Sequence, residues 1–415
     1  MNAAVLARVV GLGSVAVGSL FCWSQTKSSA ACEDSPQLEL KLVQVLFRHG
    51  ARTPLKSIPD VLEVQWVPKL LDVPPHTLID YVVTDLQGGP QPASPVEDSY
   101  REHALSGGTY PGQLTTIGMQ QLYDLGTRLR ARYIQDVPFL TPSFTPAEVY
   151  IRSTNIVRTI ESAKCLVAGL FQQKQTGTVP ILTSQAETEI LYPNYHGCKL
   201  LRLLSGHRWA ESAKLPDIAK DIKEIQGDLG IPLEKEVDFI LIRDDMVARQ
   251  THGLACPPQL DNWKSKVEQR AVDMIYHVYE PSKKGNLQLC VGPLLHTMLS
   301  NMEEKVQGTS SEPHRKLFLY SVHDTTLMPC LMALGIFDMR WPPYAADITM
   351  ELLENRTTKE AFVKVLYLGK EQHIPGCSSK TCPLKEFQQA MAEYALPLDR
   401  YNKQCEETKG FPSEP

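Results

Sequence analysis

Three short apolar segments, each ending in polar residues, set the hydrophobic pattern of the chain. They are LVQVLFRHGARTP (residues 42–54), AEVYIRST (147–154) and KLFLYSVHD (316–324). Apolar runs of this length, rich in β-branched and aromatic residues, are typical of buried strands. We therefore predict a strand in each segment.

Helical patterns lie between these segments. Apolar residues recur at helical spacing from Ile156 to Leu170, and TTLMPCLMAL after the third segment runs to Gly335, a suitable C-cap. Residues 117–133 place apolar side chains on one face behind Thr115 or Thr116 as N-cap. Strands that alternate with helices predict a mainly parallel sheet covered by helices on both faces.

Three parts of the chain depart from this alternation. Residues 347–369 predict two antiparallel strands around a polar turn. The stretch 61–104 is rich in Pro, Gly and Asp, and the stretch 195–313 holds mostly helical patterns. We predict that these two insertions form a cap domain. The α/β core is then expected from residues 33–60, 105–194 and 314–415.

The first 32 residues are interpreted as a targeting leader. They contain no acidic residue and are rich in Ala and Ser. Their apolar part, Val9 to Trp23, is shorter than the about 20 residues that span a bilayer. A mitochondrial presequence and a secretory signal both fit this composition. Asn355 begins an N-x-S/T sequon, which the secretory route would allow to be glycosylated.

Composition and charge exclude one class of partner. Of the 415 residues 43% are apolar and 21% charged, as in an ordinary globular protein. The 42 Lys and Arg against 47 Asp and Glu give a net charge of −5, which argues against nucleic-acid binding. An anion site must therefore be a local concentration of positive charge.

Such a concentration is predicted where the strands end. Ligands of open α/β sheets bind outside the carboxyl ends of the strands, so the polar residues there should meet in one site. Three guanidinium forks match the oxygens of a phosphoryl group, a geometry that Lys does not offer. The residues at or just after the strand ends are Arg48, His49, Arg52, Arg158, His323 and Asp324.

This set can hydrolyse a phosphate ester in two steps. One of the two histidines can act as nucleophile, because neighbouring arginines keep an imidazole neutral. Asp324, the only carboxylate of the set, would protonate the leaving oxygen. A phosphohistidine would form and then be hydrolysed by water. We expect no metal and no other cofactor, because the arginines supply the charge stabilisation.

The same residues carry a resemblance to a known family. RHGARTP (48–54) resembles the RHGxRxP signature of the histidine acid phosphatases, and SVHDTT (321–326) resembles their second motif. YPGQLTTIGMQQLYDLG, YIRSTNIVRT, PPYAADITMEL and IPGCSSKTCPL resemble further segments, so the similarity covers nearly all of residues 38–396. The family implies a three-layer α/β/α fold similar to that of phosphoglycerate mutases, with an inserted, mostly helical cap.

The resemblance also implies roles for individual residues. His49 would be the nucleophile, and Asp324 the acid and then the base. The phosphoryl group would be held by Arg48, Arg52, Arg158 and His323. The entrance would be lined by Thr53, Pro54, Leu55 and Lys56.

Within the family the similarity is strongest to a mitochondrial group that acts on lysophosphatidic acid. It implies hydrolysis of that lipid to monoacylglycerol and phosphate by a monomer in peripheral contact with a membrane. A broad-specificity acid phosphatase that also accepts phosphotyrosine stays open. So do a phosphoglycerate mutase, which would lack Arg52 and Pro54, and a silent binder of phosphate esters, which would lack the nucleophile or the acid.

The cysteines bear on the compartment. Cys377 and Cys382 have close spacing and no His at ligand spacing, so a disulfide loop is expected rather than zinc. Cys198 resembles a disulfide cysteine of secreted relatives, but Asp347 stands at the expected partner position. A lost disulfide would favour a less oxidising compartment, and with the leader it favours mitochondrial import.

One apolar run leaves two interpretations open. The run from Asp60 to Pro75 favours core or cap packing over a lipid groove, although it is the best candidate in the sequence for holding an acyl chain.

Overall fold

The computed structural model describes residues 38–280 and 284–408. The predicted leader over residues 1–32, and residues 33–37 of the predicted core, lie outside the described residues. In the described part no helix is both long and apolar enough to cross a membrane.

A mixed sheet forms the centre of the described chain. Its strand order is β2-β4-β3-β5-β1-β6-β7-β8, and β9 pairs with β7. The pairs β2-β4, β4-β3, β3-β5 and β5-β1 are parallel. The pairs β1-β6, β6-β7, β7-β8 and β7-β9 are antiparallel. The strands are β1 (Leu38–Arg48), β2 (Tyr81–Thr84), β3 (Val149–Ser153), β4 (Val179–Leu182), β5 (Leu317–Val322), β6 (Asp347–Asn355), β7 (Ala361–Tyr367), β8 (Lys370–Glu371) and β9 (Thr381–Pro383).

Helices connect and cover these strands. The α-helices are α1 (Pro95–Tyr100), α2 (Thr116–Arg130), α3 (Val157–Phe171), α4 (Lys199–Ser212), α5 (Pro216–Leu229), α6 (Phe239–Thr251), α7 (Lys264–Tyr279), α8 (Lys284–Gln307), α9 (Asp324–Ala333), α10 (Leu384–Met391) and α11 (Leu398–Cys405). Short 3₁₀ turns are η1 (Pro68–Leu71), η2 (Pro75–Thr77), η4 (Ala186–Thr188) and η5 (Pro258–Asn262), and a π-helical turn, η3 (Ala131–Asp136), extends α2.

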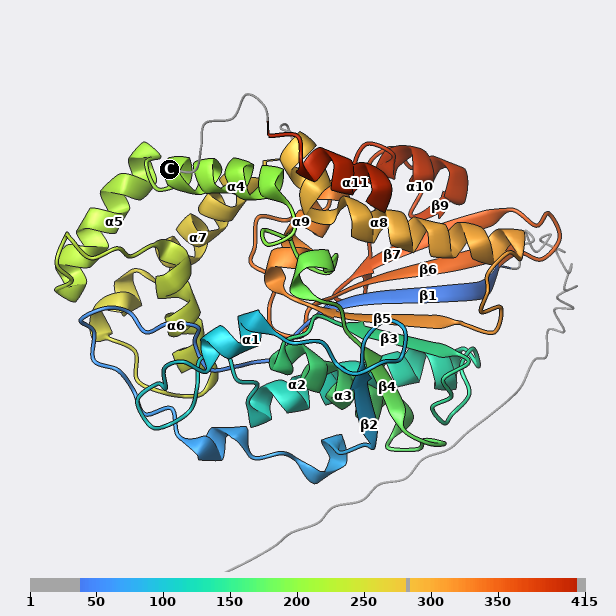
Figure 1. Ribbon diagram of the computed structural model, residues 1–415, viewed down its shortest axis with the longest axis horizontal. Coiled ribbons are helices and arrows are strands. Elements are labelled where there is room, and N and C mark those ends of the chain that lie inside the picture. Colours follow the sequence, from blue (N-terminus) through green and yellow to red (C-terminus); the bar gives the residue numbers. More distant parts are fainter. Residues whose placement is uncertain (1–37, 281–283, 409–415) are drawn as a thin grey trace, which may run out of the picture. The chain divides into compact units, whose positions relative to one another are not determined.

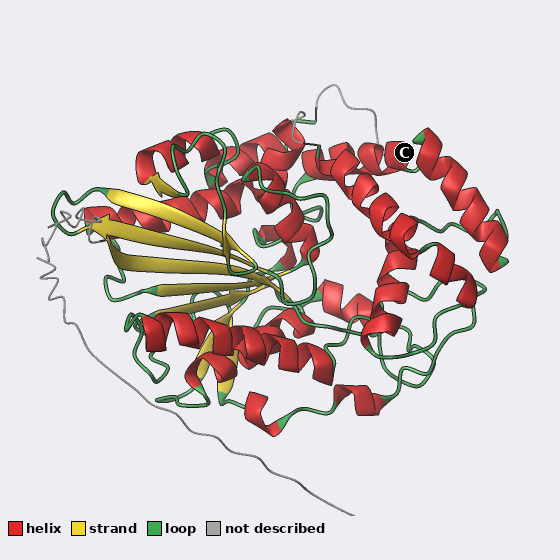
Figure 2. Ribbon diagram, turned by 180° about the vertical axis from the view of Figure 1, so that it is seen from behind, coloured by secondary structure: helices red, strands yellow, loops and turns green. Residues whose placement is uncertain are grey.

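Both faces of β1 are buried, which explains its nearly continuous apolar sequence. Leu42 and Leu46 pack in the cluster formed with α8 and α9. Val43, Val45 and Phe47 point to the other face and pack in the cluster formed with α2 and α3. Figure 2 shows the sheet with helices on both sides. The predicted three-layer α/β/α fold is confirmed.

The main predicted elements are confirmed as well. The three predicted strands are β1, β3 and β5, and residues 347–369 contain the antiparallel pair β6 and β7. Thr115 is the N-cap of α2, its hydroxyl accepting from Gly118 N. Gly335 ends the turn after α9 with a φ of +68°, a conformation that costs glycine little.

Helices α4 to α7 lie beyond the ends of β1 and β5 and form the cap (Figure 1). The two predicted cap insertions, however, are not entirely cap. From 61–104, β2 pairs in parallel with β4 and extends the sheet. From 195–313, α8 packs on the sheet, where Met298 O accepts from the buried Gln44 side chain of β1. A parallel sheet needs both faces covered, and the second insertion supplies part of that cover.

The structure corrects the prediction for Cys198. It forms a disulfide with Cys405 at the end of α11, and Cys377 pairs with Cys382 as predicted. Asp347 instead accepts hydrogen bonds from Arg128 Nη2 (2.5 Å) and from Thr349 Oγ1 (3.0 Å). The partner cysteine lies in a different element from the one expected by resemblance. The lost-disulfide argument for a less oxidising compartment is therefore wrong.

Candidate active site

The ends of two neighbouring parallel strands place the first site residues side by side. Arg48 at the end of β1 pairs in register with Val322 at the end of β5, and His49 N donates to Val322 O at 3.1 Å. His323 follows as the N-cap of α9 and Asp324 as its first residue. The rings of His49 and His323 are consequently 5.5 Å apart between centroids. The parallel register thus joins two motifs that are far apart in the sequence.

Gly50 in the RHG motif is required by close packing. A Cβ on Gly50 would come within 2.3 Å of Gly118 O at the start of α2. A Cβ on Gly118 would come within 2.1 Å of Ala51 O. The two glycines therefore let the turn after β1 pack directly on α2.

Three buried guanidiniums surround His49, and each keeps donors without a partner. Arg48, Arg52 and Arg158 are 2%, 3% and 5% exposed. Within the described part of the chain, the Nε of each and Nη1 of Arg158 have no hydrogen-bond partner. Arg158 Nη2 reaches only Tyr100 OH, at 3.5 Å. Unpaired donors are costly when buried, so this cluster is built to receive an anionic ligand.

The carboxylate of Asp324 is held by three donors. Its Oδ2 accepts from Arg48 Nη2 (2.6 Å) and Trp341 Nε1 (2.9 Å), and its Oδ1 accepts from Thr325 N (2.8 Å). Burial alone would raise the pKa of Asp324. The charges of Arg48 and Arg52 and the hydrogen bond from Trp341 outweigh burial and lower this pKa below its ordinary value. Asp324 is therefore ionised in the free site.

Both histidines are neutral in the free site. Burial and the charge of Arg158 hold the pKa of His49 and that of His323 well below the ordinary value. His323 Nε2 lies 3.0 Å from Thr154 Oγ1 at the end of β3. His49 Nδ1 lies 2.9 Å from Gly50 O, which can only accept. The proton of His49 is thus on Nδ1, and Nε2 keeps its lone pair.

Arg52 has a partner that the sequence did not reveal. Asp244 of α6 accepts from Arg52 Nη1 (3.2 Å) and Nη2 (2.8 Å), and also from Leu55 N (2.7 Å). This one carboxylate joins the cap to Arg52 and to the loop after it. Asp244 thus pairs with both terminal nitrogens of Arg52, whereas Arg52 Nε has no hydrogen-bond partner among the described residues. Nothing in the pattern of DFILIRDDMVARQ distinguishes Asp244 from an exposed helical acid.

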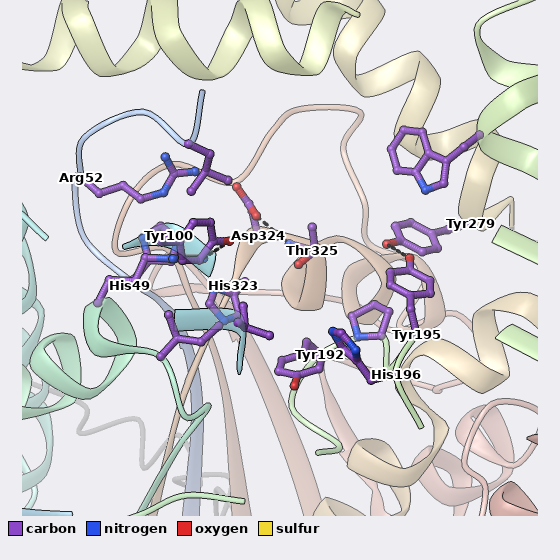
Figure 3. A pocket seen from close by; sticks show the side chains of 16 residues that line it. His49, Arg52, Tyr100, Tyr192, Tyr195, His196, Tyr279, His323, Asp324 and Thr325 are labelled. Carbon is purple, nitrogen blue, oxygen red and sulfur yellow. Dashed lines mark hydrogen bonds between the residues drawn. The ribbon is translucent and has the colours of Figure 1, made fainter. Parts of the chain in front are cut away.

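A cavity of about 310 Å³ opens beside these residues. Figure 3 shows His49, Arg52, His323 and Asp324 toward one side, and Tyr192, Tyr195, His196 and Tyr279 toward the other. A second cavity of about 290 Å³ shares five of its lining residues: Arg52, Leu55, Trp209, Asp324 and Thr325. The charged site therefore adjoins two mainly apolar chambers. The sequence predicted no role for the nine histidines outside the motifs, but one of them, His196, lines the first chamber.

The predicted entrance loop divides into lining and supporting residues. Leu55 lines both cavities and Lys56 the second. Thr53 is buried and donates its hydroxyl to Tyr110 O at 2.7 Å, and Pro54 O accepts from Gly112 N at 3.2 Å. Thr53 and Pro54 therefore hold the loop in place.

The apolar run from Asp60 to Pro75 is absent from the described lining of both cavities. Its Trp66 packs in a separate cluster with Leu105 and Ala248, which favours the packing interpretation. Among the described residues no group of three or more His, Cys, Asp or Glu side chains could hold a metal ion.

Comparison with known proteins decides the family. The model of the histidine phosphatase superfamily (branch 2) matches residues 39–223 and 262–368. The chain belongs to this family. It is similar to lysophosphatidic acid phosphatase type 6 of Homo sapiens, with 46% identity over 91% of this chain and 88% of that protein. The Mus musculus protein of the same name is 44% identical over 94% of this chain and 95% of that protein.

Solved structures agree on the fold. The apo form of the Hafnia alvei phytase superimposes with a TM-score of 0.58 at 17% identity, covering 89% of this chain and 98% of that chain. The resemblance stated from the motifs is confirmed. The chain is a histidine acid phosphatase, an enzyme that hydrolyses phosphomonoesters, which removes the mutase and silent-binder alternatives.

Arg158 gives the most direct test of the anion site. Among the described residues no ion pair joins Arg158 to a carboxylate, so Arg158→Gln removes ligand donors without breaking a salt bridge of the described fold. We expect the inhibition constant for inorganic phosphate to rise about 10- to 100-fold, the effect of one or two charged hydrogen bonds. Competitive inhibition by phosphate measures this, and an unchanged melting temperature excludes misfolding. An unchanged inhibition constant would contradict an anion site at Arg158.

Proposed function

We propose that this enzyme hydrolyses lysophosphatidic acid to monoacylglycerol and phosphate through a phosphohistidine on His49. The observation that carries the proposal is the set of unpaired guanidinium donors around a neutral His49, beside a chamber with apolar walls. The names of the relatives at 44% and 46% identity support the lipid substrate.

The cavity walls suit an acyl glycerol leaving group. Leu55, Val96 and Ile156 line the first chamber together with tyrosines and Trp209. Ile240, Leu241 and Ile275 of the cap line the second. Binding sites for drug-sized ligands have about 300–1,000 Å³, so either chamber can hold a sizeable apolar group. Apolar surface buried there favours a lipid ester over a small polar one.

His49 has the state that a nucleophile needs. Its Nδ1 proton is engaged by Gly50 O, so the lone pair on Nε2 is available for attack on phosphorus. Because its pKa lies well below the ordinary value, the ring stays unprotonated in mildly acidic solution. Attack forms the N–P bond and breaks the P–O bond of the ester. Arg48, Arg52, Arg158 and His323 would hold the phosphoryl oxygens.

Asp324 must be protonated for the first step, although it is ionised in the free site. A phosphoryl group that binds Arg48 draws this cation away from the carboxylate and places negative charge beside it. Both effects raise the pKa of Asp324, so the substrate itself favours the acid form. The ionised form then accepts a proton from the water that hydrolyses the phosphohistidine. Because the free pKa is low, we expect activity to be best in acidic solution.

A substrate comparison tests the lipid assignment. We expect kcat/KM to be at least about 10-fold higher for lysophosphatidic acid than for a phosphotyrosyl peptide, since burying a few methylene groups is worth that factor. Phosphatidic acid, with its second acyl chain, should be slower than lysophosphatidic acid. Equal rates on the three substrates would favour the alternative, a broad-specificity acid phosphatase, and leave the phosphatase assignment intact.

Asp324→Asn tests the mechanism. An alkyl ester needs a proton on its leaving oxygen, so its kcat/KM should fall about 100- to 10,000-fold without the general acid. An activated aryl phosphate needs no such proton and should still phosphorylate His49, after which the enzyme stalls. Quenching in alkali and mapping the label should place it on His49, and His49→Ala should show none. Label on another residue, or wild-type rates on alkyl esters, would refute the scheme.

We also propose mitochondrial import, now supported only by the acid-free leader. Secretion is the alternative. Treating the native protein with a glycosidase specific for N-linked sugars should leave its electrophoretic mobility unchanged. A mobility shift that disappears in Asn355→Gln would assign the protein to the secretory route.

A further inference from the structure

The indole N–H of Trp341 donates to the same carboxylate oxygen of Asp324 as Arg48. Trp341 lies in the loop between α9 and β6, and its side chain is largely buried, with 8% exposed. Its Nε1 donates to Asp324 Oδ2 at 2.9 Å. The sequence motifs did not mark this residue, because it lies 17 positions from its partner, outside both signatures.

The cap fixes the position of this indole. The guanidinium carbon of Arg243 in α6 lies 4.4 Å from the centre of the Trp341 ring, a cation–π contact. Arg243 is itself fixed by Glu268 of α7, through Nε to Oε2 at 2.6 Å and Nη2 to Oε1 at 3.0 Å. Contacts therefore run without a gap from two cap helices to the carboxylate of Asp324.

The indole differs from the other donors in what substrate binding does to it. Arg48 also contacts Asp324 Oδ2, but the phosphoryl group competes for this guanidinium. Thr325 N contacts only Oδ1. The indole carries no charge that would attract phosphate, its single N–H is already donated to Asp324, and its ring packs against Arg243. It is the donor to Oδ2 that stays in place through the cycle.

We propose that Trp341 is a positioning residue for the acid, and that cap helices α6 and α7 set its place through Arg243 and Glu268. Trp341 orients the Asp324 carboxyl toward the leaving oxygen and favours its ionised form. The inference rests on the proposed role of Asp324 as the acid. It adds that the cap, besides walling the substrate chamber, controls proton transfer.

Trp341→Phe removes the N–H and keeps an aromatic ring under Arg243. Losing a donor to the carboxylate raises the pKa of Asp324, so the acid form persists to higher pH. The descending limb of kcat/KM against pH, measured with an alkyl phosphate, should move up by about one pH unit, as expected for one charged hydrogen bond. At the optimum pH of each enzyme, the alkyl-to-aryl ratio of kcat/KM should fall about 10-fold, because the acid is less well oriented.

The cap offers a matched control. Trp263 donates its Nε1 to Asp228 Oδ2 at 2.7 Å, and Lys266 Nζ lies 4.7 Å from the centre of its ring. Neither Trp263 nor Asp228 lines the two cavities beside the site, whereas Trp341 lines the second. Trp263→Phe should leave both the descending limb of kcat/KM against pH and the alkyl-to-aryl ratio of kcat/KM at their wild-type values. A Trp341→Phe enzyme in which the limb or the ratio also stays at the wild-type value would overturn the proposal.

Arg243→Gln provides a second route if Trp341→Phe does not fold. It keeps the indole but removes the cation that packs against it. The alkyl-to-aryl ratio should then fall about two- to threefold, and the descending limb should move up by about 0.3 to 0.5 pH unit, the size of a weak cation–π contact. No movement in this variant would likewise overturn the proposal. Asp324→Asn separates the two ideas: if it keeps wild-type alkyl-to-aryl selectivity, the role of Asp324 fails, whatever Trp341 does.

Discussion

The burial of three guanidiniums at the end of a parallel sheet is the constraint on which the rest of the structure depends. Cations taken out of water are costly unless an opposite charge or a set of acceptors receives them. Asp324 partners Arg48 and Asp244 partners Arg52. Within the described residues, Arg158 has a tyrosine hydroxyl as its partner and keeps two nitrogens unpaired. The protein therefore compensates these charges only in part, and the phosphate that we propose for this site would compensate the rest.

The cap and the core both contribute partners to these buried charges. Asp244 comes from α6 of the cap, yet it completes an arginine that follows β1 of the core. The next residue toward the N-terminus, Arg243, reaches the acid through Trp341. Two consecutive residues of one cap helix thus contact two charged residues of the candidate site, Arg52 directly and Asp324 through Trp341. A shift of α6 would disturb phosphate binding and proton transfer together.

The sequence predicted those features that follow from local pattern and strand ends. β1, β3 and β5 were found because buried parallel strands are continuously apolar, and Arg48, His49, His323 and Asp324 were brought together because parallel strands end at one edge. Asp244, Trp341 and the Cys405 partner of Cys198 were not found. Their contacts join elements that are distant along the chain, and only tertiary packing specifies them. β2 was not predicted, because its four residues lie in a proline-rich stretch and are too few to show a periodic hydrophobic pattern.

The separation of chemistry from selectivity follows from the same geometry. The groups that would act on phosphorus all lie at strand ends or the first turns of helices, where the backbone of the sheet fixes them. The walls of the two chambers come largely from the segment at Tyr192 to His196 and from cap helices α4, α6 and α7, with Leu55, α1 and Ile156 completing them. A phytase shares the fold at 17% identity, and one fold can carry many different functions. We therefore expect substrate selectivity to reside in the chamber walls, whose side chains can change without moving the strand ends.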